Sequence, residues 1–190
     1  EVNNFMVKRQ CIGTPNIPTE DDPSTPDTPD TPTGAVFSES FATGLGAFTE
    51  EFVNLPEGLT YIFSWYEQAK CAKASGFANS KAYDTEAYLV SPAFAVPAAG
   101  ATVTFEHATN YFASTETARA ETGLYIREEG TTTWTPLTVP DYPTSQSWSF
   151  VSSGDIDIKA WAGKRVQLGF RYSSTSAKAG TWEFKTLVVK

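Results

Sequence analysis

The stretch from residue 147 to 190 constrains the fold of this chain most strongly, because its apolar residues alternate with polar ones. Between residues 165 and 172, one parity carries only apolar side chains: Val166, Leu168, Phe170 and Tyr172. The other parity holds Arg165, Gln167 and Arg171. A period of two over this length is typical of a β-strand with one buried face. The pattern therefore predicts a sheet protein rather than a helical one.

Similar short segments recur along the chain, with Gly, Pro, Ser and Asn between them. The predicted strands are 36–41, 59–65, 69–77, 87–90, 102–108, 123–127, 148–151, 155–158, 165–172 and 181–189. Many short strands without a 3.6-residue period favour an all-β, antiparallel two-sheet sandwich over residues 35–190. Local helical propensity is found at 114–120, which is short and polar.

The segment 14–34 predicts an extended linker rich in Pro, Thr and Asp. Six prolines alternate there with acidic residues: Pro15, Pro18, Pro23, Pro26, Pro29 and Pro32. Each proline fixes φ and removes a backbone donor, and the acidic side chains repel one another. Residues 1–13 could form a single strand, and one strand cannot fold alone. We expect it to be the last strand of a preceding domain; the alternatives are packing on the main domain or disorder.

Charge and composition exclude some functions. The 190-residue chain has 14 basic and 22 acidic residues, so its formal net charge is 14 − 22 = −8. With no Lys/Arg cluster interleaved with aromatics, a nucleic-acid partner is not expected. No apolar run approaches the roughly 18 residues of a membrane-spanning helix. The two cysteines, Cys11 and Cys71, lack metal-binding spacing, and the sequence leaves open whether they pair.

Several segments together resemble a known family. They are 72–77 (AKASGF), 87–94 (AYLVSPAF), 104–112 (TFEHATNYF), 155–174 and 181–190. Their order and spacing are similar to those of choice-of-anchor J domains of bacterial surface and secreted proteins, which are related to cleaved-adhesin and MAM-like jelly rolls. The resemblance implies an extracellular or cell-surface jelly roll, often joined to other domains. It also implies a calcium ion near the first strand in some relatives, which makes Glu39 the metal candidate; the alternative is an ordinary surface glutamate. Those relatives commonly carry an acidic residue shortly after the tryptophan of the last strand, where this chain has Lys185.

Candidates for catalysis are few. His107 is the only histidine, and it shares a strand parity with Val103 and Phe105, so we expect a buried imidazole held by a hydrogen bond. Asp155 and Asp157 alternate with isoleucines and should face outward on a solvated strand. A glycosidase would need two carboxyl groups across a groove. Acids are available for such a pair: Glu39, Glu86, Glu106, Glu121, Glu128 and Glu129.

Aromatic side chains are the other source of binding, because a sugar ring can stack on Trp or Tyr while polar groups fix its hydroxyls. The candidates are Tyr83, Tyr142, Trp65 and Tyr111. Tyr83 and Tyr142 lie in polar or Pro-flanked loops, and we expect them to be the more exposed. Trp148 and Trp182 are expected in the core.

These observations predict a non-catalytic extracellular or cell-surface module that binds a glycan or a protein. Two alternatives remain open at this point. One is a structural spacer or display domain without a ligand, which a concave aromatic-lined groove would count against. The other is a jelly-roll glycoside hydrolase, which requires two carboxyl groups facing each other.

Overall fold

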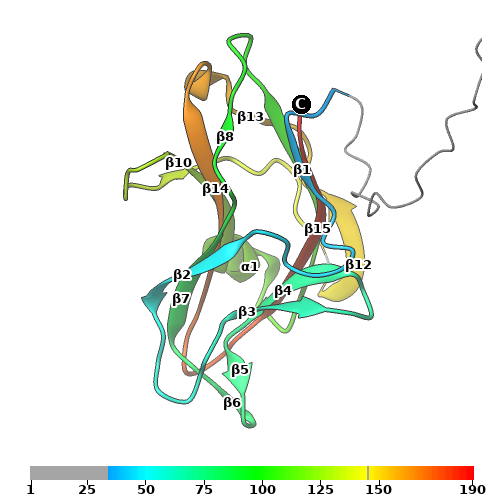
Figure 1. Cartoon of the computed structure of the whole chain (residues 1–190). Helices are drawn as coiled ribbons and strands as arrows, with labels where there is room; N and C mark the ends of the chain where they lie inside the picture. The colour runs from blue at the N-terminus through cyan, green and yellow to red at the C-terminus, as the bar shows by residue number, and fades with distance from the viewer. Residues whose placement is uncertain (1–33, 145) are drawn as a thin grey trace, which may run out of the picture. The chain divides into compact units, whose positions relative to one another are not determined.

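The structure is a computed structural model that describes residues 34–144 and 146–190 (Figure 1). Within this part the chain forms antiparallel sheets, a small hairpin and two short helices. The strand expected at 1–13, Cys11, and all of the expected linker except Gly34 lie outside the described residues.

The first sheet, sheet A, has the strand order β12–β9–β15–β4–β3. Its strands are β12 (Ser147–Ser152), β9 (Thr102–Asn110), β15 (Thr181–Val189), β4 (Cys71–Ser75) and β3 (Phe63–Tyr66). Two short strands join it: β1 (Phe37–Glu39) pairs with β15, and β13 (Ile156–Asp157) pairs with β9. All these pairings are antiparallel.

The second sheet, sheet B, has the order β11–β10–β14–β7–β2. Its strands are β11 (Thr135–Pro136), β10 (Thr122–Glu128), β14 (Arg165–Ser174), β7 (Thr85–Val90) and β2 (Thr49–Asn54), and β8 (Phe94–Ala95) pairs with β14. These pairings are antiparallel as well. The remaining elements are the hairpin β5 (Phe77–Ala78) and β6 (Lys81–Ala82), α1 (Thr115–Glu121) and a 3-10 turn, η1 (Lys159–Trp161).

The hydrophobic core lies between sheets A and B. Phe170 from β14 stacks on Phe184 from β15, with ring centroids 4.0 Å apart and planes 7° apart, so the two sheets face each other through these rings. Trp182, also on β15, is 0% exposed. In β14 the apolar parity is buried and Arg165 is exposed, as the alternation predicted. The expected all-β antiparallel sandwich is confirmed.

The short helix α1 begins where its sequence indicates. The hydroxyl of Ser114 accepts a hydrogen bond from the backbone N–H of Thr117 and so caps the first turn. The helix ends at Glu121, and Thr122 starts β10 directly after it. The helical propensity predicted at 114–120 is therefore confirmed to within one residue at each end.

The β5–β6 hairpin projects from one end of the sandwich. Its two turn residues, Asn79 and Ser80, have φ of 50° and 62°. Positive φ at both central positions is the geometry of a tight two-residue hairpin turn. At the opposite end of the sandwich, β1 starts beside the C-terminal end of β15 (Figure 1). The hairpin is thus remote from the place where the described chain begins and ends.

Candidate functional site

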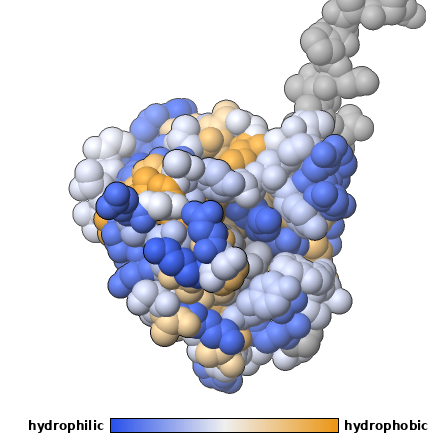
Figure 2. Space-filling model, turned by 90° about the horizontal axis from the view of Figure 1, so that it is seen from below, coloured by the Kyte–Doolittle hydropathy of each residue, from blue (hydrophilic) through white to orange (hydrophobic). Residues whose placement is uncertain are grey.

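A cleft of about 990 Å³ lies beside the hairpin, and we call it the hairpin cleft. Its walls come from three segments distant in sequence: residues 58–62, the β5–β6 hairpin and residues 176–179. The outer face of sheet A completes it through Lys73 and Thr181. Figure 2 views the molecule from this end, where strongly hydrophilic residues lie beside hydrophobic ones.

A second hollow of about 460 Å³ continues from the first along sheet A, and we call it the strand groove. Lys73, Tyr111 and Thr181 line both hollows, so the two are contiguous. The strand groove adds the aromatic residues Tyr66, Trp148 and Phe150 and the carboxylate Glu183.

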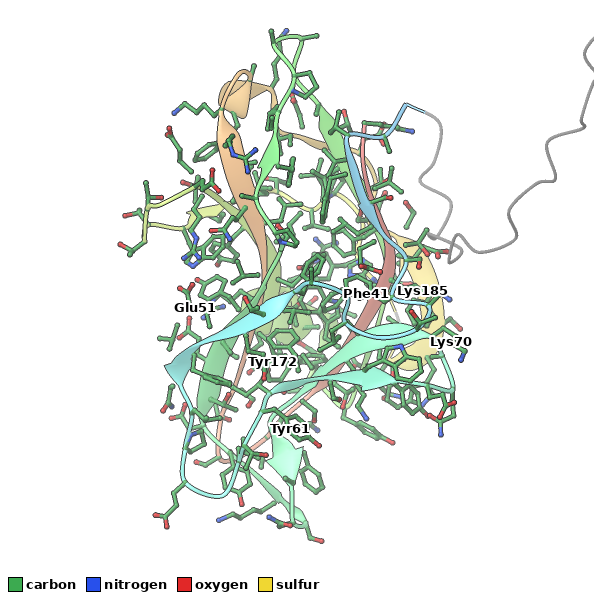
Figure 3. The ribbon with its side chains drawn as sticks, in the orientation of Figure 1. Phe41, Glu51, Tyr61, Lys70, Tyr172 and Lys185 are labelled. Carbon is green, nitrogen blue, oxygen red and sulfur yellow. The ribbon has the colours of Figure 1, made fainter. Side chains whose placement is uncertain are left out.

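Large aromatic side chains around these hollows are open to solvent. Tyr61 is 56% exposed, Phe77 57%, Tyr111 59% and Trp148 46%. Tyr111 and Trp148 meet edge to face, with ring centroids 5.6 Å apart. Tyr61 lies at the hairpin end of the molecule, whereas Tyr172 points between the sheets (Figure 3). Exposed aromatic rings concentrated around the two hollows make them the candidate binding surface.

Tyr111 reaches this surface because β9 ends in an unusual backbone turn. Its φ is 65°, in the left-handed region that L residues with a β-carbon disfavour by roughly 1–2 kcal/mol. The backbone N–H of Tyr111 donates to Oδ1 of the preceding Asn110 at 2.8 Å, which supports the turn. Backbone strain of this kind is often found at functional sites. Of the four predicted ligand-binding residues, Tyr111 is the one that the structure places on the two hollows.

The prediction that Trp148 lies in the core is wrong, since its side chain is 46% exposed. It belongs to β12, an edge strand of sheet A whose pairing with β9 is irregular between Ser147 and Val151. The register puts Val151 opposite the buried His107, and Trp148 and Phe150 line the strand groove on the outer face. The apolar parity of this strand therefore faces outward.

Two lysines lie close to aromatic rings of the strand groove, Lys73 in its lining and Lys185 beside it. Lys73 Nζ is 4.7 Å from the centroid of the Tyr66 ring, and Lys185 Nζ is 4.1 Å from that of Phe150. Glu183 is 2% exposed, and burial raises the pKa of its carboxyl group. The positive charge of Lys73 partly offsets this by lowering the pKa.

The Cys71 thiol lies beside this carboxylate. Burial, followed by the charge of Glu183, raises the pKa of Cys71 to about 12. Cys71 is a free, buried cysteine, so it acts as a small apolar side chain of the sheet rather than as a reactive thiol.

A buried tyrosine ties two walls of the hairpin cleft together. The hydroxyl of Tyr172 donates to the carbonyl of Gly180 at 2.6 Å and accepts the N–H of Gly76 at 3.0 Å. Gly76 leads directly into the β5–β6 hairpin, and Gly180 follows the loop 176–179. Burial raises the pKa of Tyr172 to about 12, so the hydroxyl keeps its proton at neutral pH.

The prediction that Tyr83 and Tyr142 are exposed is wrong. Tyr83 is 7% exposed and packs under Gly58, where an added β-carbon would lie 2.8 Å from its hydroxyl oxygen. Tyr142 is 8% exposed; its hydroxyl donates to the carbonyl of Thr122 at 3.0 Å. Their position in loops suggested exposure to solvent, but both rings are buried, and Tyr142 belongs to the hydrophobic core. Their role in ligand binding remains a prediction.

Trp65 lies apart from both hollows. Its indole N–H donates to the carbonyl of Phe41 at 2.9 Å, and Lys70 Nζ is 5.2 Å from its ring centroid. The side chain is partly buried and anchors the loop after β1. Any binding by Trp65 would therefore take place at a separate surface.

Glu39 is engaged with its own loop. Its Oε1 accepts the backbone N–H of Phe41 at 2.8 Å, and its carboxylate packs against Gly46. Over residues 34–144 and 146–190, no group of three or more His, Cys, Asp or Glu side chains could hold a metal ion. The side chains on this loop thus do not supply an acidic ligand set, and calcium binding at Glu39 remains a prediction.

His107 has the structural role that its parity predicted. It is 0% exposed, and its Nδ1 accepts the indole N–H of Trp182 at 3.2 Å. Nε2 therefore carries the proton and donates to the carbonyl of Asp141 at 3.0 Å. Burial lowers the pKa of His107 to about 4, so the imidazole is neutral at physiological pH.

The acidic candidates do not form a catalytic pair in these hollows. The hairpin cleft is lined by no carboxylate and the strand groove by Glu183 alone. Three of the sequence candidates are ion-paired elsewhere, Glu86 with Arg171, Glu128 with Lys164 and Glu129 with Arg165. Asp155 and Asp157 are exposed between the buried Ile156 and Ile158, as predicted.

Sequence reasoning named Tyr111 but missed Tyr61, Phe77 and the lysines of the hairpin cleft. Tyr61 and Phe77 lie next to turn residues, which is a weak signal for exposure. Lys81 and Lys178 lie beside turns as well. The cleft itself could not be foreseen, because it forms only where three segments distant in sequence meet.

An antiparallel sandwich of this kind is the fold of cleaved adhesin domains. The chain is similar to the K3 cleaved adhesin domain of Lys-gingipain (Kgp) from Porphyromonas gingivalis W83, with a TM-score of 0.51 and 15% identity over 82% of this chain and 98% of that one. The K1 domain of the same protein gives a TM-score of 0.48 and 17% identity over 81% and 96%.

At this identity the likeness establishes the fold. No family model and no curated protein matches the chain. The predicted relation to cleaved-adhesin jelly rolls is thus supported at the level of fold, and membership of the choice-of-anchor J family remains a prediction. In the described part of the chain, no helix is long and apolar enough to cross a membrane.

Proposed function

We propose that this chain is a non-catalytic extracellular or cell-surface module that binds a glycan in the hairpin cleft and the strand groove. The observation that carries the proposal is the set of four half-exposed aromatic rings around the two contiguous hollows. The fold shared with a cleaved adhesin domain is in keeping with it.

Glycan binding is favoured over the other functions that the sequence left open. Sugar rings stack on aromatic faces, and short hydroxyl side chains such as Thr60, Ser64 and Ser75 can bond their hydroxyl groups. A spacer without a ligand has no need for exposed aromatic rings around a concavity. A glycoside hydrolase acting here would need a second carboxylate beside Glu183.

A glycan array probed with the full chain tests this proposal. We expect specific glycans to bind, and Tyr111→Ala to weaken binding about tenfold or more, because losing one well-stacked ring costs more than about 1 kcal/mol. Phe52→Ala is the matched control: Phe52 is 42% exposed on β2, away from both hollows. Absence of glycan binding, or equal effects of the two variants, would refute the proposal.

Calcium binding at Glu39 is a separate proposal that rests on the family resemblance. Repeating the array with a chelator, together with Glu39→Gln, tests whether a metal ion supports the binding. Loss of binding with chelator and in the variant is the expected result. Unchanged binding under both conditions would exclude a calcium role in ligand binding.

A further inference from the structure

The hairpin cleft is positively charged in a protein that is acidic as a whole. Three lysines line it, Lys73, Lys81 and Lys178, and no carboxylate does. The whole chain carries a formal net charge of −8. Glu57 and Asp84 lie near the cleft segments in sequence but are not among its lining residues. The charge of this cleft is therefore opposite to that of the chain.

These lysines come from separate segments, and in the described part of the chain none of them forms a salt bridge. Lys73 is on β4, Lys81 on β6, and Lys178 in the loop between β14 and β15. Among residues 34–144 and 146–190, the salt bridges are formed by Arg127, Lys164, Arg165 and Arg171, all outside the cleft. Lys81 Nζ lies 4.4 Å from the centroid of the Tyr83 ring, which orients its stem without neutralising its charge. The positive charge is thus available to a ligand.

The carboxylate of the adjoining strand groove, Glu183, competes weakly for this charge. Glu183 lies in the strand groove, which shares Lys73 with the hairpin cleft. Its carboxyl is almost fully buried, and no salt bridge joins it to Lys73 in the described residues. Lys81 and Lys178 do not line the strand groove at all. An anionic ligand in the hairpin cleft would therefore meet three cations.

We propose that the hairpin cleft binds an acidic saccharide, that is, a glycan with carboxylate or sulfate groups. This inference rests on the proposed function and names the ligand class. The exposed rings of Tyr61 and Phe77 would stack on sugar faces, and the lysines would hold the anionic substituents. A volume of about 990 Å³ lies at the upper end of ordinary ligand sites and suits an oligosaccharide rather than one sugar.

The lining favours a saccharide over a bare inorganic anion. Small polar side chains are spread over the walls: Thr60, Ser64, Ser75, Asn79, Ser80 and Ser176. They supply hydroxyl and amide groups that bond to sugar hydroxyls.

The test compares two hexasaccharides that differ in charge, using the full chain and isothermal calorimetry. The acidic probe alternates glucuronic acid with N-acetylglucosamine, and the neutral probe is the N-acetylglucosamine hexamer. An additional hexasaccharide, made of sulfated sugars, tests sulfate as the anionic group. We expect at least about tenfold tighter binding of an acidic probe than of the neutral one, and weaker binding as NaCl rises from about 0.05 to about 0.5 M.

Variants then place the effect in the cleft. Lys81 and Lys178 are both exposed, so the double variant Lys81→Gln/Lys178→Gln should fold normally. This double variant is expected to bind the acidic probe about tenfold more weakly and to bind the neutral probe as tightly as the parent chain does. Lys159→Gln, at an exposed lysine outside both hollows, is the matched control and should change neither.

Three results overturn the inference. Tight binding of the neutral probe with no preference for acidic ones would refute the ligand class but leave the proposed glycan function intact. If the double lysine variant still prefers the acidic probes, the acidic saccharide binds at a site other than the hairpin cleft. Binding of no glycan at all would refute both proposals.

Discussion

Replacing Tyr172 with phenylalanine removes a single oxygen atom that joins two distant segments of the fold. The ring is 0% exposed and lies between the sheets (Figure 3). Its hydroxyl satisfies the N–H of Gly76 and the carbonyl of Gly180. Phenylalanine keeps the ring and its packing, so the variant removes these two hydrogen bonds together with the interaction of the hydroxyl with the Ser174 side chain.

The expected loss follows from the burial of both partners. Leaving a buried polar group without its hydrogen bond costs about 1–3 kcal/mol. With two groups affected, Tyr172→Phe should lower the free energy of unfolding by about 2–4 kcal/mol. Since domains are stable by about 5–15 kcal/mol, such a loss is readily measured.

Urea unfolding followed by the fluorescence of the five tryptophans measures this difference. Tyr88→Phe is the control, because Tyr88 is 7% exposed and its hydroxyl makes no hydrogen bond to any described residue. That variant should change the free energy of unfolding by less than about 0.5 kcal/mol. If Tyr172→Phe also stays within about 0.5 kcal/mol of the parent chain, the bridging role assigned to the hydroxyl is wrong.

Three further predictions concern stability, titration and thiol reactivity rather than ligand binding. Gly180→Ala should cost about 1–3 kcal/mol in urea unfolding, because the new β-carbon would overlap the Phe112 ring. Gly44→Ala should be near neutral, because its new β-carbon makes only an ordinary contact, 3.9 Å from the Gly46 backbone nitrogen. Because burial lowers the pKa of His107 to about 4, its ring NMR signals should not titrate between pH 8 and about 5. In that window the unfolded chain binds more protons, because its histidine has a pKa near 6.5. The contribution of His107 to stability is therefore complete above about pH 6.5 and falls as the pH drops toward 4. A ring that titrates near 6.5 in the folded protein would contradict this. In a Cys11→Ser chain, Cys71 should react with a thiol reagent only after unfolding, because its pKa is about 12; rapid reaction of the native chain would show that the site opens.

Strand patterning made most of the fold predictable. In β14 the alternation assigns each side chain to a face, since successive residues of a strand point to opposite sides. The same argument placed His107 inside and Asp157 outside, and both placements are confirmed. Local rules also sufficed for α1, where the Ser114 cap and the following sequence specify a short helix.

The same rules failed where tertiary context decides the outcome. Trp148 and Phe150 alternate with serines, which resembles a core-facing strand, but β12 is an irregular edge strand whose apolar parity faces outward. Tyr83 and Tyr142 were expected in solvent because they lie in loops, but tertiary contacts bury them, Tyr83 against Gly58 and Tyr142 against Thr122. Neither outcome is encoded in the local pattern of residues.

The pairing of β1 with the end of β15 has a mechanical consequence. Phe37, at the start of β1, lies opposite Val189, at the end of β15, and the backbone N–H of Val36 donates to the Val189 carbonyl. Tension applied through segments on either side of the sandwich would pull these two neighbouring points apart. The hydrogen bonds between the strands would then carry the load one after another, as in unzipping, rather than together, as in shear. Under tension the sandwich should therefore open first at β1, at the end opposite the β5–β6 hairpin (Figure 1).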